Sequence, residues 1–201
     1  MKISSLDRTL LLLTGLLAGY QIAIGIDQMD SVSIIAYTIA FGVILVAGLL
    51  LMILGFDVLE APIVVIISTV IPLTLSLGLI WQHLASLRTV YLIFAIIGFL
   101  AVTVTRSIPM QNKLPVITIA VTHGIAGMTI FLLPIVLAFQ GQVKPLFSLV
   151  GVGGALIGVG GLLLSFLKTG KPILSRDTIM RLFPILLLLT TALFVAGFKY
   201  G

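Results

Sequence analysis

Residues 32–56 read VSIIAYTIAFGVILVAGLLLMILGF, a stretch without a single charged side chain. About 20 apolar residues are enough to carry an α-helix across the ~30 Å hydrocarbon layer of a membrane. Because that layer holds no water, the backbone must satisfy its own hydrogen bonds, and a helix does so within one segment. The stretch therefore predicts a transmembrane helix.

Six other apolar runs of comparable length lie between charged, glycine and proline residues. The seven predicted spans are 9–26, 32–56, 61–81, 89–105, 114–138, 146–167 and 182–198. The connections between them are too short to form a soluble domain. We therefore expect an all-α polytopic membrane protein, in which residues 1–201 form a single bundle of seven transmembrane helices.

The composition agrees with this class of protein. Hydrophobic residues make up 60% of the chain and charged residues only 8%, whereas about 25% of a soluble domain is charged. The chain has no cysteine, which excludes disulfides and thiolate metal sites. We expect no metal and no cofactor. The net charge of +5 is interpreted as a topology signal, so the expected partner is membrane lipid and not nucleic acid.

The positions of the basic residues predict the orientation. Loops on the cytoplasmic side are enriched in lysine and arginine. With the N-terminus inside, the cytoplasmic set is Lys2, Arg8, Arg106, Lys113, Lys168, Lys171, Arg176 and Arg181, and the opposite set is Arg88, Lys144 and Lys199. We therefore expect a protein of the cell membrane with a cytoplasmic N-terminus and an external C-terminus. A thylakoid or other energy-converting membrane is the alternative location.

The first and last three spans show weak similarity to each other. The matched segments are 13–19 with 121–127, 46–51 with 159–164, and 71–75 with 183–187. They occur in the same order, each about 110 positions apart, and such weak internal similarity is how transporter repeats are detected. With the fourth span as a linker, the two halves would be parallel, in a 3+1+3 arrangement similar to that of the SWEET sugar transporters. Chance similarity between helices rich in leucine and glycine is the other explanation.

Ionisable side chains are scarce inside the predicted spans. No aspartate, glutamate, lysine or arginine lies well within one, although pumps driven by protons or ions usually keep such a group. His123 is the exception. It is interpreted either as a neutral histidine bonded to a neighbouring helix or as a substrate donor, proton relay or cofactor ligand.

Hydroxyl and amide side chains provide the other candidates for a cavity. Thr118, Thr122 and Thr129 share one face of the fifth span, and Thr69 and Ser76 share a face of the third. Tyr20 and Gln21 lie in the first span. These residues could line a path for a polar solute, or they could form ordinary hydrogen bonds between helices.

Proline and glycine suggest where helices bend and where they approach each other. Pro72 and Pro134 lie inside spans and should kink them, as hinges or as fixed bends. Two Gly-x-x-x-Gly pairs predict close helix packing. These pairs are Gly15 with Gly19 and Gly154 with Gly158.

The segment before the last span is basic. Lys168, Lys171, Arg176 and Arg181 could bind anionic lipid headgroups, at about 1 kcal/mol per residue. They could equally act only as a topology signal. At the other connections, Asp30 or Ser31 is expected to cap the second span, and Glu60 before Pro62 fits the start of the third.

These features leave three classes of function. The first is a small permease or facilitator for a neutral or weakly polar solute. The second is a non-catalytic structural or assembly subunit of a larger membrane complex, respiratory or photosynthetic. Besides lipid, the expected partner is such a complex or a second copy of the chain in a homo-oligomer. The third, an enzyme, ranks last, because the sequence shows no paired carboxylates, catalytic triad or cluster of metal ligands.

Overall fold

The computed structural model describes residues 3–26, 29–168 and 173–201, and within these ranges every regular element is a helix, as the sequence predicts. The α-helices are α1 (Ser5–Ile24), α2 (Ser31–Leu54), α3 (Pro62–His83), α4 (Arg88–Ser107), α5 (Leu114–Phe139), α6 (Ser148–Lys168) and α7 (Arg176–Tyr200). The short 3-10 helices are η1 (Phe56–Glu60), η2 (Ala85–Leu87) and η3 (Pro145–Phe147). An α-helix therefore lies at each of the seven apolar runs.

Six of these helices, α2 to α7, are long and apolar enough to cross a membrane. Helix α1 carries Asp7, Arg8 and Gln21 and is not one of the six. Large apolar side chains lie on the outside of the bundle, such as Ile53 at 71% exposure and Val90 at 66%. An apolar surface of this extent is compatible with lipid as the surrounding solvent. The chain thus has the features of a multi-pass membrane protein.

The helix ends are set by capping groups, which explains why some helices exceed the apolar runs. Helix α1 begins at Ser5 because Ser4 and Asp7 form a reciprocal capping box ahead of the first apolar residues. Ser175 caps α7, which therefore begins six residues before the predicted position 182. Asp30 caps α2 and Pro62 is the first residue of α3, both as expected.

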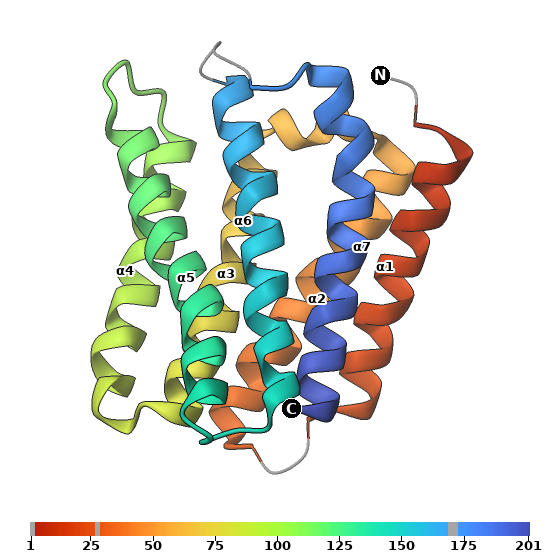
Figure 1. Cartoon of the computed structure of the whole chain (residues 1–201). Coiled ribbons are helices and arrows are strands. Elements are labelled where there is room, and N and C mark those ends of the chain that lie inside the picture. Colours follow the sequence, from red (N-terminus) through yellow and green to blue (C-terminus); the bar gives the residue numbers. More distant parts are fainter. Residues whose placement is uncertain (1–2, 27–28, 169–172) are drawn as a thin grey trace.

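Six of the helices form a closed ring. Each contacts the next in the order α1, α2, α3, α5, α6 and α7, and α7 returns to α1. Helix α4 lies outside this ring, against α3 and α5, and is at the edge of the bundle in Figure 1. The first three helices and the last three therefore form the two sides of the ring, and α4 connects them.

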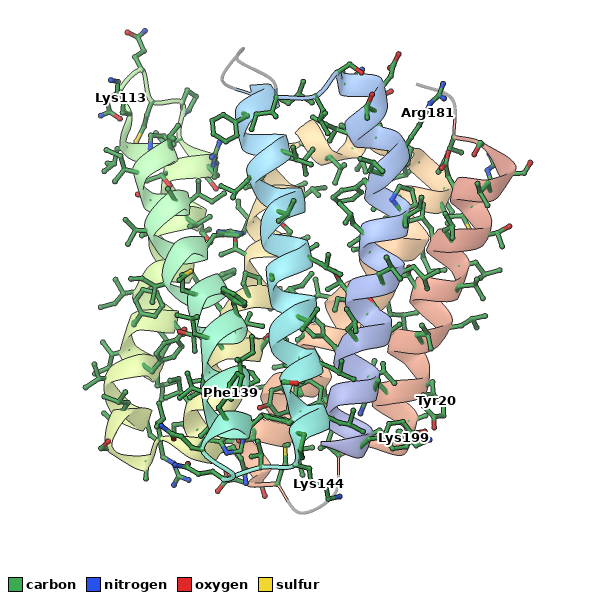
Figure 2. All side chains as sticks on the ribbon, in the orientation of Figure 1. Tyr20, Lys113, Phe139, Lys144, Arg181 and Lys199 are labelled. Atoms are coloured by element: carbon green, nitrogen blue, oxygen red, sulfur yellow. The ribbon has the colours of Figure 1, made fainter. Side chains whose placement is uncertain are left out.

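The two ends of the bundle differ in their residues. The chain termini lie at opposite ends (Figure 1). Lys113 and Arg181 lie at the end that holds the N-terminus, and Tyr20, Lys144 and Lys199 lie at the end that holds the C-terminus (Figure 2). We call these the N-terminal end and the C-terminal end.

Candidate functional site

A hollow with a volume of about 510 Å³ opens at the C-terminal end of the bundle. It lies among the ends of α3 and α7, the α5–η3 turn and the segment before α2. Its lining residues are Ile26, Met29, Gln82, His83, Gly141, Gln142, Val143, Lys144, Phe147, Phe198 and Gly201. The hollow thus combines amides, an imidazole and an ammonium group with aromatic rings, a mixture typical of sites for small polar molecules.

Aromatic rings extend from the hollow into the bundle. The ring of Phe147 lies 5.4 Å from that of His83 and 6.0 Å from that of Phe198, measured between centroids. Phe198 in turn packs against Tyr37 at 4.5 Å and Phe41 at 6.1 Å. Tyr37, Phe41, Phe147 and Phe198 are all buried. We call these four residues the aromatic floor, because Phe147 and Phe198 line the hollow and Tyr37 and Phe41 pack against Phe198.

The absence of a side chain at Gly78 allows the Tyr37 ring to fit between α2 and α3. A Cβ atom at Gly78 would lie only 2.5 Å from Cε1 of the Tyr37 ring, so any side chain there would displace the ring. One helical turn before Tyr37, the Ser33 hydroxyl donates a 3.1 Å hydrogen bond to the Gly78 carbonyl and links the two helices. The close contact between α2 and α3 thus fixes the position of the aromatic floor.

Gln21 and Tyr37 each have one buried side-chain atom without a hydrogen-bond partner. Gln21 is 2% exposed and Tyr37 1% exposed. The Gln21 Oε1 and Tyr37 hydroxyl find no partner within the described part of the chain, and neither does Nε2 of His83. Both Gln21 and Tyr37 line a second, small cavity between α1 and α2. Gln21 is thus one of the predicted candidates that lies at a cavity.

Tyr20, the residue before Gln21, lies on a different and more exposed face of α1. Successive residues on a helix are 100° apart, so Tyr20 cannot share the environment of Gln21. It is 40% exposed, and its hydroxyl accepts a 2.6 Å hydrogen bond from Lys199 Nζ, which also lies 5.2 Å from the centre of the Tyr20 ring. Tyr20 therefore joins α1 to α7 at the C-terminal end, as Figure 2 shows.

Three buried hydroxyl groups of α1 and α3 are satisfied within their own helices. Thr14, Thr69 and Ser76 are fully buried. Thr14 donates to the Leu10 carbonyl and Thr69 to the Val65 carbonyl, and Ser76 donates to carbonyls one turn earlier in α3. Such bonds remove the need for a partner on another helix. The structure thus places Thr69 and Ser76 in the interior, each bonded within α3.

The threonines of α5 lie toward α4. Thr122 is buried opposite Gly98 of α4, where a Cβ atom on the glycine would lie 3.1 Å from Thr122 Cγ2. Thr129 donates to the Ile125 carbonyl and lies 3.4 Å from the Tyr91 hydroxyl, also on α4. Thr118 is half-buried near the start of the helix. Since α4 is outside the ring, Thr122 and Thr129 form part of a helix contact remote from the hollow.

His123 has a basic neighbour that sequence analysis assigned to a loop. Arg106 lies in the last turn of α4, the helix that packs against α5 and its His123. Within the described ranges, the buried Nε of Arg106 has no hydrogen-bond partner. The pair lies toward the N-terminal end of the bundle, away from the hollow.

One member of each predicted glycine pair lies against another helix, and the contact of Gly154 is the tighter. Gly154 faces Ile130 of α5, and Gly15 faces Leu45 of α2. Gly19 and Gly158 have no atom within 4 Å of an added Cβ. Pro72 and Pro134 lie inside α3 and α5, as expected, and Pro184 is a third internal proline, in α7.

The basic segment at the N-terminal end is only partly described. Lys171 lies outside the described residues, and of Lys168 only the helical backbone is described. Arg176 forms a 3.3 Å ion pair with Asp57, which joins α7 to η1. Arg181 lies at the same end of the bundle (Figure 2).

Several residues around the hollow were not selected from the sequence. His83, Phe147 and Phe198 come from three elements far apart in the chain, and no local pattern connects them. Tyr37 did carry a signal, because a tyrosine in the middle of an apolar run brings a hydroxyl that needs a partner. Among the described residues, no group of three histidine, cysteine or acidic side chains could hold a metal ion.

Comparisons with protein-family models, curated proteins and solved structures find no match to this chain.

Proposed function

We propose that this protein is a non-enzymatic permease or facilitator for a neutral or weakly polar solute, and that the hollow is one mouth of its path. The observation that carries the proposal is the open hollow at the C-terminal end, which has a volume of about 510 Å³. Phe147 and Phe198 of the aromatic floor line it, and it shares Ile26 with a second, small cavity lined by Gln21 and Tyr37. Membrane proteins tolerate buried polar groups mainly along pathways or at contacts.

The helix order supports this function. In a parallel repeat, the second group of three helices must follow the first in the same rotational order and with the same directions. The ring order α1, α2, α3, α5, α6, α7 meets this requirement, with α4 outside as the linker. Internal prolines at Pro72 in α3 and Pro184 in α7 occupy corresponding helices. The mouth of the path would then lie between the two halves, because residues of both line the hollow.

The orientation is part of the proposal. We place α1 across the membrane beside α2 and α7, although it is less apolar than they are, because it runs along the whole bundle (Figure 1). The predicted cytoplasmic cations then belong to the N-terminal end, which holds Lys113 and Arg181. The hollow would thus face the outside of the cell.

The chemistry of the lining favours an uncharged solute. Lys144 is the only charged side chain among the described residues that line the hollow, and it lies in the exposed α5–η3 turn. The floor and the second, small cavity present aromatic rings, an amide and hydroxyls. A charged solute would lose its hydration there without a counter-charge, whereas a neutral one could exchange hydrogen bonds.

Solute flux in liposomes tests the proposal. Purified protein should accelerate the entry of at least one member of a neutral series from water and urea to glycerol and a hexose. Phe198→Ala opens the aromatic floor and should raise that flux or admit a larger solute. Leu100→Ala, on the outer face of α4 at 55% exposure, is the matched control. Flux equal to that of protein-free liposomes for the whole series would refute the function.

One observation favours the alternative of a subunit in a larger complex. Gly124 and Gly158 are exposed on α5 and α6 with no atom within 4 Å of an added Cβ. Small residues on a lipid-facing surface allow another helix to approach closely. Native electrophoresis from mild detergent separates the two functions, because a subunit should migrate with partners and show no flux.

A further inference from the structure

A contact between two side chains joins the ends of α1 and α7 near the hollow. Lys199 Nζ donates a 2.6 Å hydrogen bond to the Tyr20 hydroxyl. It also lies 5.2 Å from the centre of the Tyr20 ring and 5.5 Å from that of Tyr200, distances at which an ammonium group is attracted to an aromatic face. We call the contact between Tyr20 and Lys199 the clasp, and Figure 2 labels both residues.

The clasp connects two walls of the hollow. On the α7 side, Phe198 directly precedes Lys199 and lines the hollow. On the α1 side, Ile26 follows the last helical residue by two positions and lines the hollow as well. These walls belong to opposite halves of the ring, which closes where α7 meets α1. A movement that parts the two helix ends would therefore also part the walls.

The end of α7 is packed more closely on its other side. A Cβ atom at Gly197 would lie 2.6 Å from Val150 Cγ2 and 2.8 Å from the Val150 backbone nitrogen, so α7 and the start of α6 are in direct contact. The neighbouring Phe198 ring lies 6.0 Å from that of Phe147 in η3. Toward α1, by contrast, both side chains of the clasp are exposed, and water can replace their hydrogen bond at little cost. When the ring opens at this end, α7 should therefore stay with α6 and separate from α1.

We propose that the ring opens at the clasp, and that Tyr20 and Lys199 set the width of the mouth of the hollow and so the largest solute that enters. The part about solute size rests on the proposed permease function, whereas the opening of the ring does not. Phe198 also packs on Tyr37 of α2 across this junction, at 4.5 Å, but both of those rings are buried. The clasp is thus the exposed contact of the junction and the one that opens first.

Hydrogen–deuterium exchange of the full chain in detergent tests the opening. Tyr20→Leu and Lys199→Met each break the clasp, so amides in the last two turns of α7 should exchange about three- to tenfold faster. The double variant should exchange no faster than Lys199→Met alone, because that substitution already removes the contact. Arg88→Met is the matched control. It removes a similar pair, in which the guanidinium lies 5.5 Å from the centre of the Trp81 ring, between α3 and α4.

Unchanged exchange in both single variants, or effects that add in the double variant, would overturn the proposal. Liposome flux of the same neutral series tests the effect on solute size. Tyr20→Leu should admit a larger member of the series than the unaltered protein does, and Tyr20→Phe, which keeps the ring, should shift the limit less. An unchanged size limit in a protein that conducts would overturn this second part. Faster exchange without flux in any variant would refute the permease function and leave the opening at the clasp intact.

Discussion

Replacing Gly154 with alanine should destabilise the bundle, and the structure supplies an internal control at Gly158. A Cβ atom at Gly154 would lie 2.7 Å from Ile130 Cγ2 and 3.2 Å from the backbone nitrogen of Phe131. Neither neighbour can move easily, because isoleucine is branched at Cβ and stiff about χ1, and the other contact is backbone. At Gly158 the same atom would meet nothing within 4 Å.

The difference in melting temperature between Gly154→Ala and Gly158→Ala isolates the cost of overpacking at Gly154. Alanine is favoured over glycine inside a helix by up to about 1 kcal/mol, and this gain applies to both variants and cancels in their difference. What remains is the cost of overpacking, typically about 1–3 kcal/mol. For a chain of this size, 1 kcal/mol corresponds to roughly 2–4 °C. Gly154→Ala should therefore melt about 2–12 °C below Gly158→Ala.

Thermal unfolding in one detergent, followed by intrinsic fluorescence or by aggregation of the unfolded protein, measures this difference. Both variants should be purified in parallel and their oligomer size recorded. Equal melting temperatures would show that the contact between α5 and α6 is not as tight as Gly154 implies. A lower melting temperature for Gly158→Ala would indicate that a partner helix occupies the open face of α6.

Three further outcomes are expected. Ser4→Ala removes the capping box with Asp7 at the start of α1 and should lower the free energy of unfolding by about 1 kcal/mol, seen as a lower Tm. Asp57→Asn weakens the ion pair with Arg176, in which the Asp57 side chain is 71% and the Arg176 side chain 44% exposed. Because exposed ion pairs contribute little, the free energy of unfolding in a chemical denaturation series should change by less than about 1 kcal/mol. Reporter fusions at Gly201 and just before Arg176 should report opposite sides of the membrane; the same side for both would contradict a crossing by α7.

Hydropathy was sufficient to place the helices but not their ends. The apolar run marks only the part of a helix that lipid surrounds, and α7 continues beyond it through its charged first turn to the cap at Ser175. Capping residues carried the missing information, as Asp30 and Pro62 illustrate. An end can thus be predicted where a capping residue stands directly beside the run.

The inward face of each helix could not be predicted, for a physical reason. A transmembrane helix is apolar all round, so its hydrophobic pattern does not distinguish neighbouring helices from lipid. The face of α5 with Thr122 and Thr129 was therefore a candidate cavity wall, yet it packs against Gly98 and Tyr91 of α4. The same uncertainty applied to Tyr20 and Gln21, which are adjacent in sequence but differ in burial.

The site itself depends on contacts between distant parts of the chain. The aromatic floor joins Tyr37 and Phe41 of α2 to Phe147 of η3 and Phe198 of α7. Phenylalanine is common in apolar runs, so neither Phe147 nor Phe198 stands out in the sequence. The two Gly-x-x-x-Gly pairs show a related limit, because spacing identifies a shared face but not which glycine meets a neighbour.

The closure of the ring between α1 and α7 has a consequence for biosynthesis. Tyr20 and Lys199, which meet at this contact, are 179 positions apart, so α1 is synthesised long before its neighbour. Until α7 has been synthesised, the flank of α1 that will contact it stays uncovered. Assembly should therefore finish with a late docking step, and chains arrested before α7 would present this uncovered flank to quality-control proteases.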